Sequence, residues 1–166
     1  DHCKDNIRLV FECGIGTNNA AIPSNMTTSG KPGASLRVWR DYFKNAEIYG
    51  ADIDDKILFL ENRIKTFYVN QLETQSIEKM WLGIDKNNFD LIIDDGLHNF
   101  EAGMQLFKNS YSKLRNGGIY IIEDVGHNYF NKLLKSLKDF NPEGIELTSK
   151  NYSQYYNNNL IIIRKV

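Results

Sequence analysis

The sequence has few cysteines, no excess of one charge sign and no long apolar run. Cys3 and Cys13 are its only cysteines, which excludes a disulfide framework and indicates free thiols in a reducing cytoplasm. Lys and Arg number 20 and Asp and Glu 21, so the chain lacks the positive charge of a general nucleic-acid binder. No apolar run approaches the ~20 residues that a membrane-spanning helix needs. We therefore predict a cytoplasmic protein with neither nucleic acid nor a membrane as its partner.

The 166 residues suffice for a single domain, 1–166, in which short apolar runs alternate with helix-like segments. The apolar runs predict seven strands: 7–13, 47–53, 66–70, 89–93, 119–122, 144–147 and 160–164. Periodic apolar residues predict five helices: 34–44, 56–65, 76–82, 102–114 and 129–140. This alternation predicts an α/β, Rossmann-like doubly wound fold. Its seven-stranded sheet should be mostly parallel, with an antiparallel hairpin at the C-terminal edge and a polar loop at 151–159.

Ligands in such open sheets bind beyond the carboxyl ends of the strands. The first predicted strand ends in Glu12, and Gly14 and Gly16 follow in a turn where glycine allows a ligand to approach the backbone closely. A tight strand-to-helix turn would explain the glycines equally. Asn19 stands where a dinucleotide-binding loop has its third glycine, and the Glu12 carboxylate favours a cationic ligand over a pyrophosphate.

Polar residues also end the second and third predicted strands. Asp52 is placed to accept hydrogen bonds from both hydroxyls of a ribose, and Asp54 is placed to cap the helix that follows. Asn70 and Gln71 follow the third strand, where a side-chain amide can pair with an adenine edge; a plain turn is the alternative.

Five ionisable residues follow the fourth and fifth long apolar runs. Asp94, Asp95 and His98 come after one strand, and Glu123 and Asp124 after the next. If the two strands are neighbours, unpaired carboxylates would repel one another unless a cation lies between them. Oxygen ligands favour a hard ion such as Mg²⁺, although helix capping is another use for acids at these positions.

Together these segments resemble the class I S-adenosylmethionine-dependent methyltransferases. More narrowly, they are similar to the metal-dependent O-methyltransferases of macrolide sugars, of the mycinamicin and macrocin type, whose family also includes proteins labelled cephalosporin hydroxylase. The resemblance covers residues 9–125. The segments that carry it are 12–16 (ECGIG), 33–43 (GASLRVWRDYF), 49–53 (YGADI), 94–98 (DDGLH) and 117–124 (GGIYIIED).

The resemblance implies binding of S-adenosylmethionine and Mg²⁺. The residues expected to contact the cofactor are Glu12, Gly14, Gly16, Ser35, Asp52, Asn70, Gln71 and Asp94. Among these, Glu12 and the glycines would line its methionine part, and Asn70 stands where the family has Asp. The metal ligands would be Asp95, Glu123 and Asp124, and the general base His98. The implied reaction is O-methylation of a sugar or sugar-containing small molecule.

The sequence leaves three alternative functions. A nicotinamide-dependent oxidoreductase is disfavoured by Glu12 and the missing third glycine. An iron-dependent hydroxylase commonly needs two His and one carboxylate, and only His98 accompanies the acids. A non-catalytic cofactor-binding module would not need these acids and His98. Because the relatives usually carry helices before the first strand, we expect that an N-terminal lid segment is absent or that a second copy supplies it. Residues 23–33 should form a loop over the cofactor.

Overall fold

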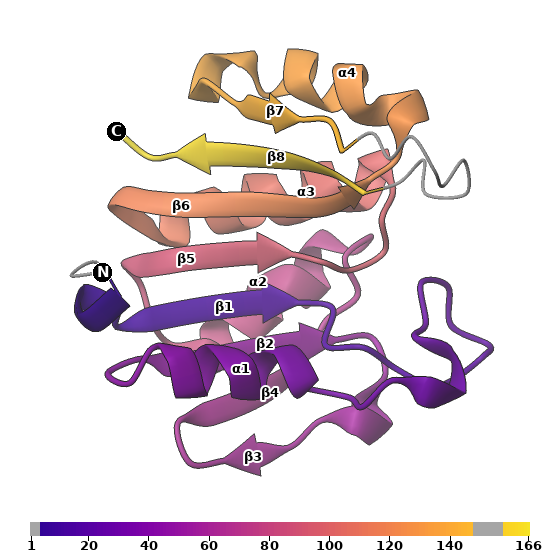
Figure 1. The fold of residues 1–166 in the computed structure, drawn as a ribbon, viewed down its shortest axis with the longest axis vertical. Helices are drawn as coiled ribbons and strands as arrows, with labels where there is room; N and C mark the ends of the chain where they lie inside the picture. Colours follow the sequence, from indigo (N-terminus) through magenta and orange to yellow (C-terminus); the bar gives the residue numbers. More distant parts are fainter. Residues whose placement is uncertain (1–3, 148–157) are drawn as a thin grey trace.

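One eight-stranded sheet organises the computed structural model, which describes residues 4–147 and 158–166 (Figure 1). Its spatial order is β3-β4-β2-β1-β5-β6-β8-β7. The strands are β1 (Leu9–Cys13), β2 (Glu47–Asp52), β3 (Leu60–Glu61), β4 (Ile64–Tyr68), β5 (Phe89–Asp94), β6 (Leu114–Val125), β7 (Glu143–Ile145) and β8 (Asn159–Arg164). Cys3 and most of the predicted loop at 151–159 lie outside the described residues, and Cys13 is a buried free thiol.

The centre of the sheet is parallel and its C-terminal edge is antiparallel. β1 pairs in parallel with β2 and β5, and the parallel pairing continues to β4 on one side and β6 on the other. β8 then runs antiparallel to both β6 and β7. The α/β fold class and the antiparallel C-terminal hairpin are thereby confirmed. The sheet has one strand more than the seven predicted.

The extra strand replaces a predicted helix, so the helix at 56–65 was wrong. Residues Asp55–Ile57 form only a short 3-10 turn, and β3 and β4 follow as an antiparallel hairpin. Leu60, one of the apolar residues of the helical pattern, is 75% exposed and does not face the core. Arg63 adopts a φ of 60° in the hairpin turn, and its guanidinium donates hydrogen bonds to the carbonyls of Arg40, Phe43 and Ala46. These long-range contacts outweigh the local helical pattern.

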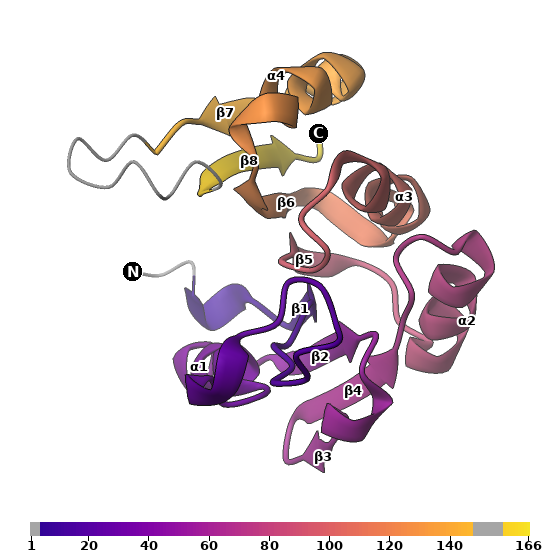
Figure 2. The same cartoon turned by 90° about the vertical axis from the view of Figure 1, so that its right-hand side faces the viewer.

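Helices cover both faces of the sheet, as Figure 2 shows. The helices are α1 (Ala34–Tyr42), α2 (Thr74–Ile84), α3 (Phe100–Ser110) and α4 (His127–Ser136). Helices α2, α3 and α4 share one apolar core with β1, β5, β6 and β8, whereas α1 packs in a second core against the opposite face. None of the helices in 4–147 and 158–166 is long and apolar enough to cross a membrane. This double covering leaves the carboxyl ends of the parallel strands as the edge where polar residues gather.

Candidate active site

A cavity of about 590 Å³ lies at the carboxyl edge of the sheet. Its wall comes from the ends of β1, β2, β4, β5 and β6 and from the segment between β1 and α1. The volume falls within the range usual for small-molecule and cofactor sites. The sheet therefore places a ligand-sized space at the edge predicted from the strand ends.

The turn after β1 packs directly on the turn after β5, and this close approach explains the glycine at position 14. Gly14 has a φ of +88°, and a Cβ there would lie 2.0 Å from the backbone oxygen of Asp95. Gly14 N donates to Ala51 O at 2.8 Å, and Asp95 N donates to Cys13 O at 2.9 Å. Gly16, with a φ of +83°, lies against the Met26 side chain. The two glycines allow three strand ends to converge on one cavity.

The segment between β1 and α1 folds back over the cavity. Met26 N donates to Thr17 O at 2.8 Å, and residues 22–26 together with Lys31 contribute to the cavity wall. The expected loop at 23–33 is thus part of the site. Thr17, which sequence reasoning did not single out, donates its hydroxyl to Asp54 at 2.5 Å. Asp54 also accepts from Lys56 N, so it caps the short 3-10 turn Asp55–Ile57 in place of the helix that it was predicted to cap.

Asp52 ends β2 with its carboxylate held by backbone amides. Its Oδ2 accepts from Ile15 N at 2.9 Å and its Oδ1 accepts from Asp54 N at 2.9 Å. Burial raises the pKa of Asp52, although these hydrogen bonds oppose the effect. Asp52 lines the cavity and also ties the turn after β1 to the end of β2.

Asn70 and Gln71 line the cavity, but their amides are engaged within the protein. Asn70 Nδ2 donates to Glu73 at 2.9 Å, and Asn70 Oδ1 accepts from Leu72 N at 3.1 Å. Gln71 Nε2 donates to Asp94 at 2.7 Å, and Gln71 Oε1 accepts from Leu97 N at 2.8 Å. The expected adenine contacts of these two amides therefore stay a prediction.

Glu12 does not line the cavity in this structure. It is 2% exposed, and its two carboxylate oxygens accept hydrogen bonds from the Ser35 hydroxyl and the Trp39 indole N–H. Ser35, at the start of α1, does line the cavity. Burial raises the pKa of Glu12 to about 7, against the effect of both hydrogen bonds. The carboxylate holds helix α1 against the end of β1.

We predict that Glu12→Gln stabilises the protein increasingly as the pH rises from about 5 to about 8. The folded state binds the Glu12 proton more tightly than the unfolded state, so the wild type loses stability as the pH rises through that window. Glutamine accepts from Trp39 and donates to Ser35 without a charge. Urea unfolding at several pH values measures the difference, which should reach roughly 3 kcal/mol. The exposed Glu78→Gln on α2 is the control. If the free energies of unfolding of the wild type and of Glu12→Gln change equally with pH across this range, the prediction is wrong.

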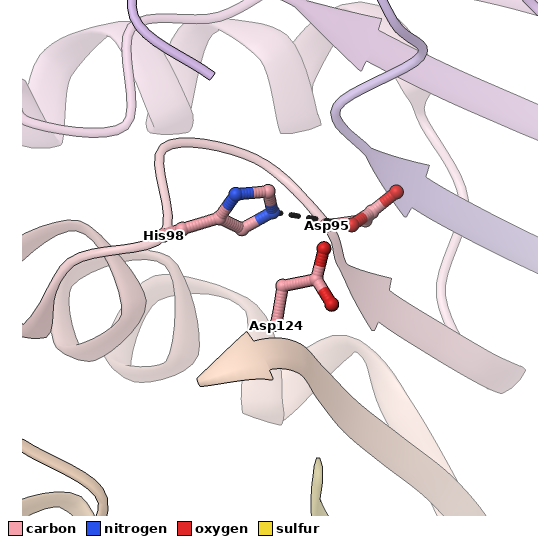
Figure 3. A group of neighbouring side chains, drawn as sticks. All are labelled: Asp95, His98 and Asp124. Carbon is pink, nitrogen blue, oxygen red and sulfur yellow. Dashed lines mark hydrogen bonds and ion pairs between the residues drawn. The ribbon is translucent and has the colours of Figure 1, made fainter. Parts of the chain in front are cut away.

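Asp95, His98 and Asp124 point toward one another at the cavity rim (Figure 3). One ligand atom of each lies within 4.8 Å of those of the other two, and His98 Nε2 is 3.2 Å from Asp95 Oδ1. Burial lowers the pKa of His98, but the hydrogen bond to Asp95 and the charges of Asp95, Asp124 and Asp94 outweigh it and raise the pKa. His98 and Asp124 have φ angles of 51° and 48°, in the left-handed region that costs energy for such residues.

Glu123 and Asp94 are not members of this cluster, but both line a second, smaller cavity that His98 also lines. Burial, together with Asp95 and Asp124, raises the pKa of Glu123 to about 7. Asp94 is buried beside Gln71, and burial raises its pKa to about 6. From each acidic pair, one member belongs to the cluster: Asp95, which follows the end of β5, and Asp124, which has a left-handed backbone near the end of β6. Asp95 and Asp124 converge as expected, whereas Glu123 stands apart from them.

Sequence similarity links the chain to O-methyltransferases of sugar-containing natural products. It is 34% identical over 127 residues to 8-demethyl-8-alpha-L-rhamnosyl tetracenomycin-C 2'-O-methyltransferase of Streptomyces olivaceus, over 76% of this chain and 31% of the relative. It is 37% identical over 98 residues to demethylmacrocin O-methyltransferase of Streptomyces fradiae, over 59% of this chain and 24% of the relative. The chain is a homologue of these sugar O-methyltransferases.

Its fold is that of the class I S-adenosylmethionine-dependent methyltransferases. A solved structure of the MycE methyltransferase of mycinamycin biosynthesis, in complex with Mg, S-adenosylhomocysteine and mycinamycin VI, superposes with a TM-score of 0.71. That match is 27% identical and covers 99% of this chain and 46% of MycE. No family model matches the chain. The chain spans less than a third of the length of the two curated relatives and less than half of MycE.

The rim of this methyltransferase fold has a donor set that suits a divalent cation. Asp95 and Asp124 offer carboxylate oxygens, the ligands that Mg²⁺ prefers, and His98 adds one nitrogen. The like charges of Asp95 and Asp124 also raise the pKa of Glu123, a repulsion that a cation would relieve. Within the described residues, this cluster contains one His rather than the two of a common iron oxygenase site.

Proposed function

We propose that the chain is the catalytic core of an S-adenosylmethionine-dependent O-methyltransferase that acts on a hydroxyl of a sugar-containing small molecule. One observation carries the proposal: Asp95, His98 and Asp124 form the cluster at the rim and also line the 590 Å³ cavity. A methyl donor in the cavity and an acceptor hydroxyl at the cluster would therefore meet at one place. Such proximity accounts for a large part of the rate of a two-substrate reaction.

The charge of the cavity wall favours the sulfonium of S-adenosylmethionine over a dinucleotide. Asp52, Asp95 and Asp124 supply carboxylates, and Lys31 supplies the one Lys or Arg side chain among the described lining residues. A pyrophosphate would face these carboxylates, whereas a cationic sulfonium is attracted by them. This argues against the nicotinamide-dependent alternative. Gly14 and Gly16 have no side chain, so the methionine part of the donor could approach the backbone closely there.

Asp95 and Asp124 would hold Mg²⁺, with Glu123 expected to join them. When bound, the cation supplies Lewis acidity that lowers the pKa of a coordinated hydroxyl. His98 would accept the proton of that hydroxyl as the new oxygen–methyl bond forms and the sulfur–methyl bond breaks. If Nε2–H donates to Asp95, Nδ1 keeps a free lone pair for this proton. The left-handed backbone at His98 and Asp124 holds both side chains toward the same point.

The relatives support the substrate class. Their names specify methylation of a rhamnosyl group on a tetracenomycin and of demethylmacrocin, and the MycE complex holds Mg, S-adenosylhomocysteine and mycinamycin VI. Vicinal sugar hydroxyls can chelate one metal ion, which fits the paired carboxylates at the rim. A glycosylated small molecule or a sugar nucleotide is therefore the proposed acceptor. A second copy that completes the acceptor site stays a prediction.

Mass spectrometry of a panel of rhamnosylated and other glycosylated metabolites tests the proposal. With S-adenosylmethionine and Mg²⁺ present, we expect a product heavier by one methylene unit and release of S-adenosylhomocysteine. Binding of S-adenosylhomocysteine without any product across the panel would favour a non-catalytic module. Thermal stabilisation by NAD and not by S-adenosylhomocysteine would overturn the methyl-donor assignment in favour of an oxidoreductase.

A further inference from the structure

Gln71 connects the cofactor cavity to the segment that carries Asp95 and His98. It lies in the turn between β4 and α2 and is 7% exposed. Two contacts of Asn70 fix this turn: Asn70 N donates to Ser76 Oγ at 2.8 Å, and Asn70 O accepts from Glu73 N at 3.1 Å. The locked turn directs the Gln71 side chain inward, toward the end of β5.

Both ends of the Gln71 carboxamide bind the 94–98 turn. Nε2 donates to Asp94 Oδ1 at 2.7 Å and Oε1 accepts from Leu97 N at 2.8 Å. Asp94 precedes Asp95 and Leu97 precedes His98, so the amide holds the turn at the residue directly before each rim residue. A reversed amide would set its NH₂ group against the Leu97 N–H, so only the observed orientation satisfies both contacts.

The glycine at position 96 leaves the space that these two hydrogen bonds of Gln71 require. A Cβ at position 96 would lie 2.0 Å from Gln71 Oε1, so a side chain there would displace the amide. Gly96 N also approaches Asp94 Oδ1 at 3.4 Å, which closes the turn around the same carboxylate. The glycine at position 96 therefore leaves room in the 94–98 turn for the Gln71 side chain, which comes from the turn after β4.

We propose that Gln71 is a positioning residue: it holds the 94–98 turn so that Asp95 and His98 face Asp124, and thereby sets the metal-binding geometry from within the cofactor cavity. The proposal rests on the proposed metal-assisted methyl transfer. It differs from a role as an adenine contact, because it requires Gln71 to act on metal binding when no cofactor is present. Substitution of residues that orient metal ligands commonly weakens metal affinity by about 10- to 100-fold.

Three measurements on Gln71→Met test the proposal, with the exposed Gln75→Met on α2 as the matched control. Methionine has a similar shape but cannot form either hydrogen bond. Calorimetric titration with Mn²⁺ in the absence of cofactor should show an affinity about tenfold weaker than in the wild type. Hydrogen exchange should show a faster-exchanging Leu97 amide, because its acceptor is lost. In steady-state kinetics with varied methyl donor, kcat should fall by a larger factor than the KM for the methyl donor rises.

Exchanging the amide and the carboxylate between positions 71 and 94 keeps the net charge and should restore Mn²⁺ affinity. Gln71→Glu keeps the acceptor for Leu97 N but loses the donor to Asp94 and sets two carboxylates together. Adding Asp94→Asn restores one donor, one acceptor and the single negative charge, so Mn²⁺ affinity should recover in the double variant. Recovery in the double variant would show that the defect of Gln71→Glu comes from this residue pair, and a melting temperature measured for each variant separates loss of Mn²⁺ affinity from loss of stability.

Each outcome decides one question. Unchanged Mn²⁺ affinity in Gln71→Met, with weaker S-adenosylhomocysteine binding, would overturn the proposal and leave Gln71 as a cofactor contact. Mn²⁺ binding by neither wild type nor variant would reject the metal-assisted function. Exchange at Leu97 would still decide whether Gln71 holds the turn, and an unchanged exchange rate would reject the proposal independently.

Discussion

Replacing His98 with alanine is expected to lower kcat by about 10²–10⁴-fold, the usual contribution of a positioned general base. Affinity for S-adenosylhomocysteine should stay at the wild-type value, because His98 lies at the rim of a cavity whose wall comes from five strand ends. Steady-state kinetics with a sugar acceptor and calorimetry with S-adenosylhomocysteine separate the two quantities.

The position of His98 beside Asp95 and Asp124 also permits a role as a metal ligand, and the same variant distinguishes the roles. A base leaves Mn²⁺ affinity almost unchanged when it is removed, whereas a ligand does not. His127, which is exposed and lies 3.9 Å from Glu146, provides the control; His127→Ala should keep wild-type turnover. Wild-type kcat in His98→Ala would remove the base assignment, and a weakened Mn²⁺ affinity would reassign His98 as a ligand.

Removal of divalent cations is expected to abolish methyl transfer, and Mg²⁺ should restore it. The expectation follows from Asp95 and Asp124, whose carboxylates converge at the rim with His98. Mg²⁺ should also raise the melting temperature of the chelator-treated protein, since it binds the folded state and relieves repulsion among the acids. A thermal-shift titration gives this second readout without any turnover.

The variant Asp124→Asn tests whether Asp124 is a ligand of the metal ion. It removes one charge at the rim and should weaken Mn²⁺ binding by at least about tenfold, with loss of the Mg²⁺-induced stabilisation. Asp139→Asn, on an exposed residue beyond the end of α4, should retain both properties. Full activity in excess chelator would defeat the metal assignment. An unchanged Mn²⁺ affinity in Asp124→Asn would instead exclude Asp124 as a ligand.

The alternation of apolar runs and helical segments was sufficient to predict the class of fold. Strands buried on both faces are nearly continuous apolar runs, so 47–53 and 89–93 stood out clearly and became β2 and β5. The prediction of a helix at 56–65 was wrong because the apolar residues of this segment follow helical spacing although it forms a hairpin. Its conformation depends instead on Arg63, whose contacts are 17 or more residues distant in the chain.

The sequence predicted which residues belong to the candidate site, but it predicted only part of how their side chains are arranged. That Asp95 and Asp124 would meet followed from their positions at the ends of neighbouring parallel strands. The resemblance singled out Asp95 of the first pair but assigned both Glu123 and Asp124 to the metal, whereas the cluster contains Asp124 without Glu123. The register between β6 and β8 shifts between Ile122 and Val125, and this irregularity redirects the side chains on either side of it.

Apart from the β3–β4 hairpin, the sequence by itself determined the alternation of strands and helices, the glycines after β1 and the placement of acids and His98 at strand ends, because these depend on local pattern. Only the tertiary structure decided the partners of the buried polar groups. Glu12 binds Ser35 and Trp39 away from the cavity, and Gln71 holds Asp94 and Leu97. A buried polar side chain takes the hydrogen-bond partner that packing brings within reach, and that partner lies far along the chain.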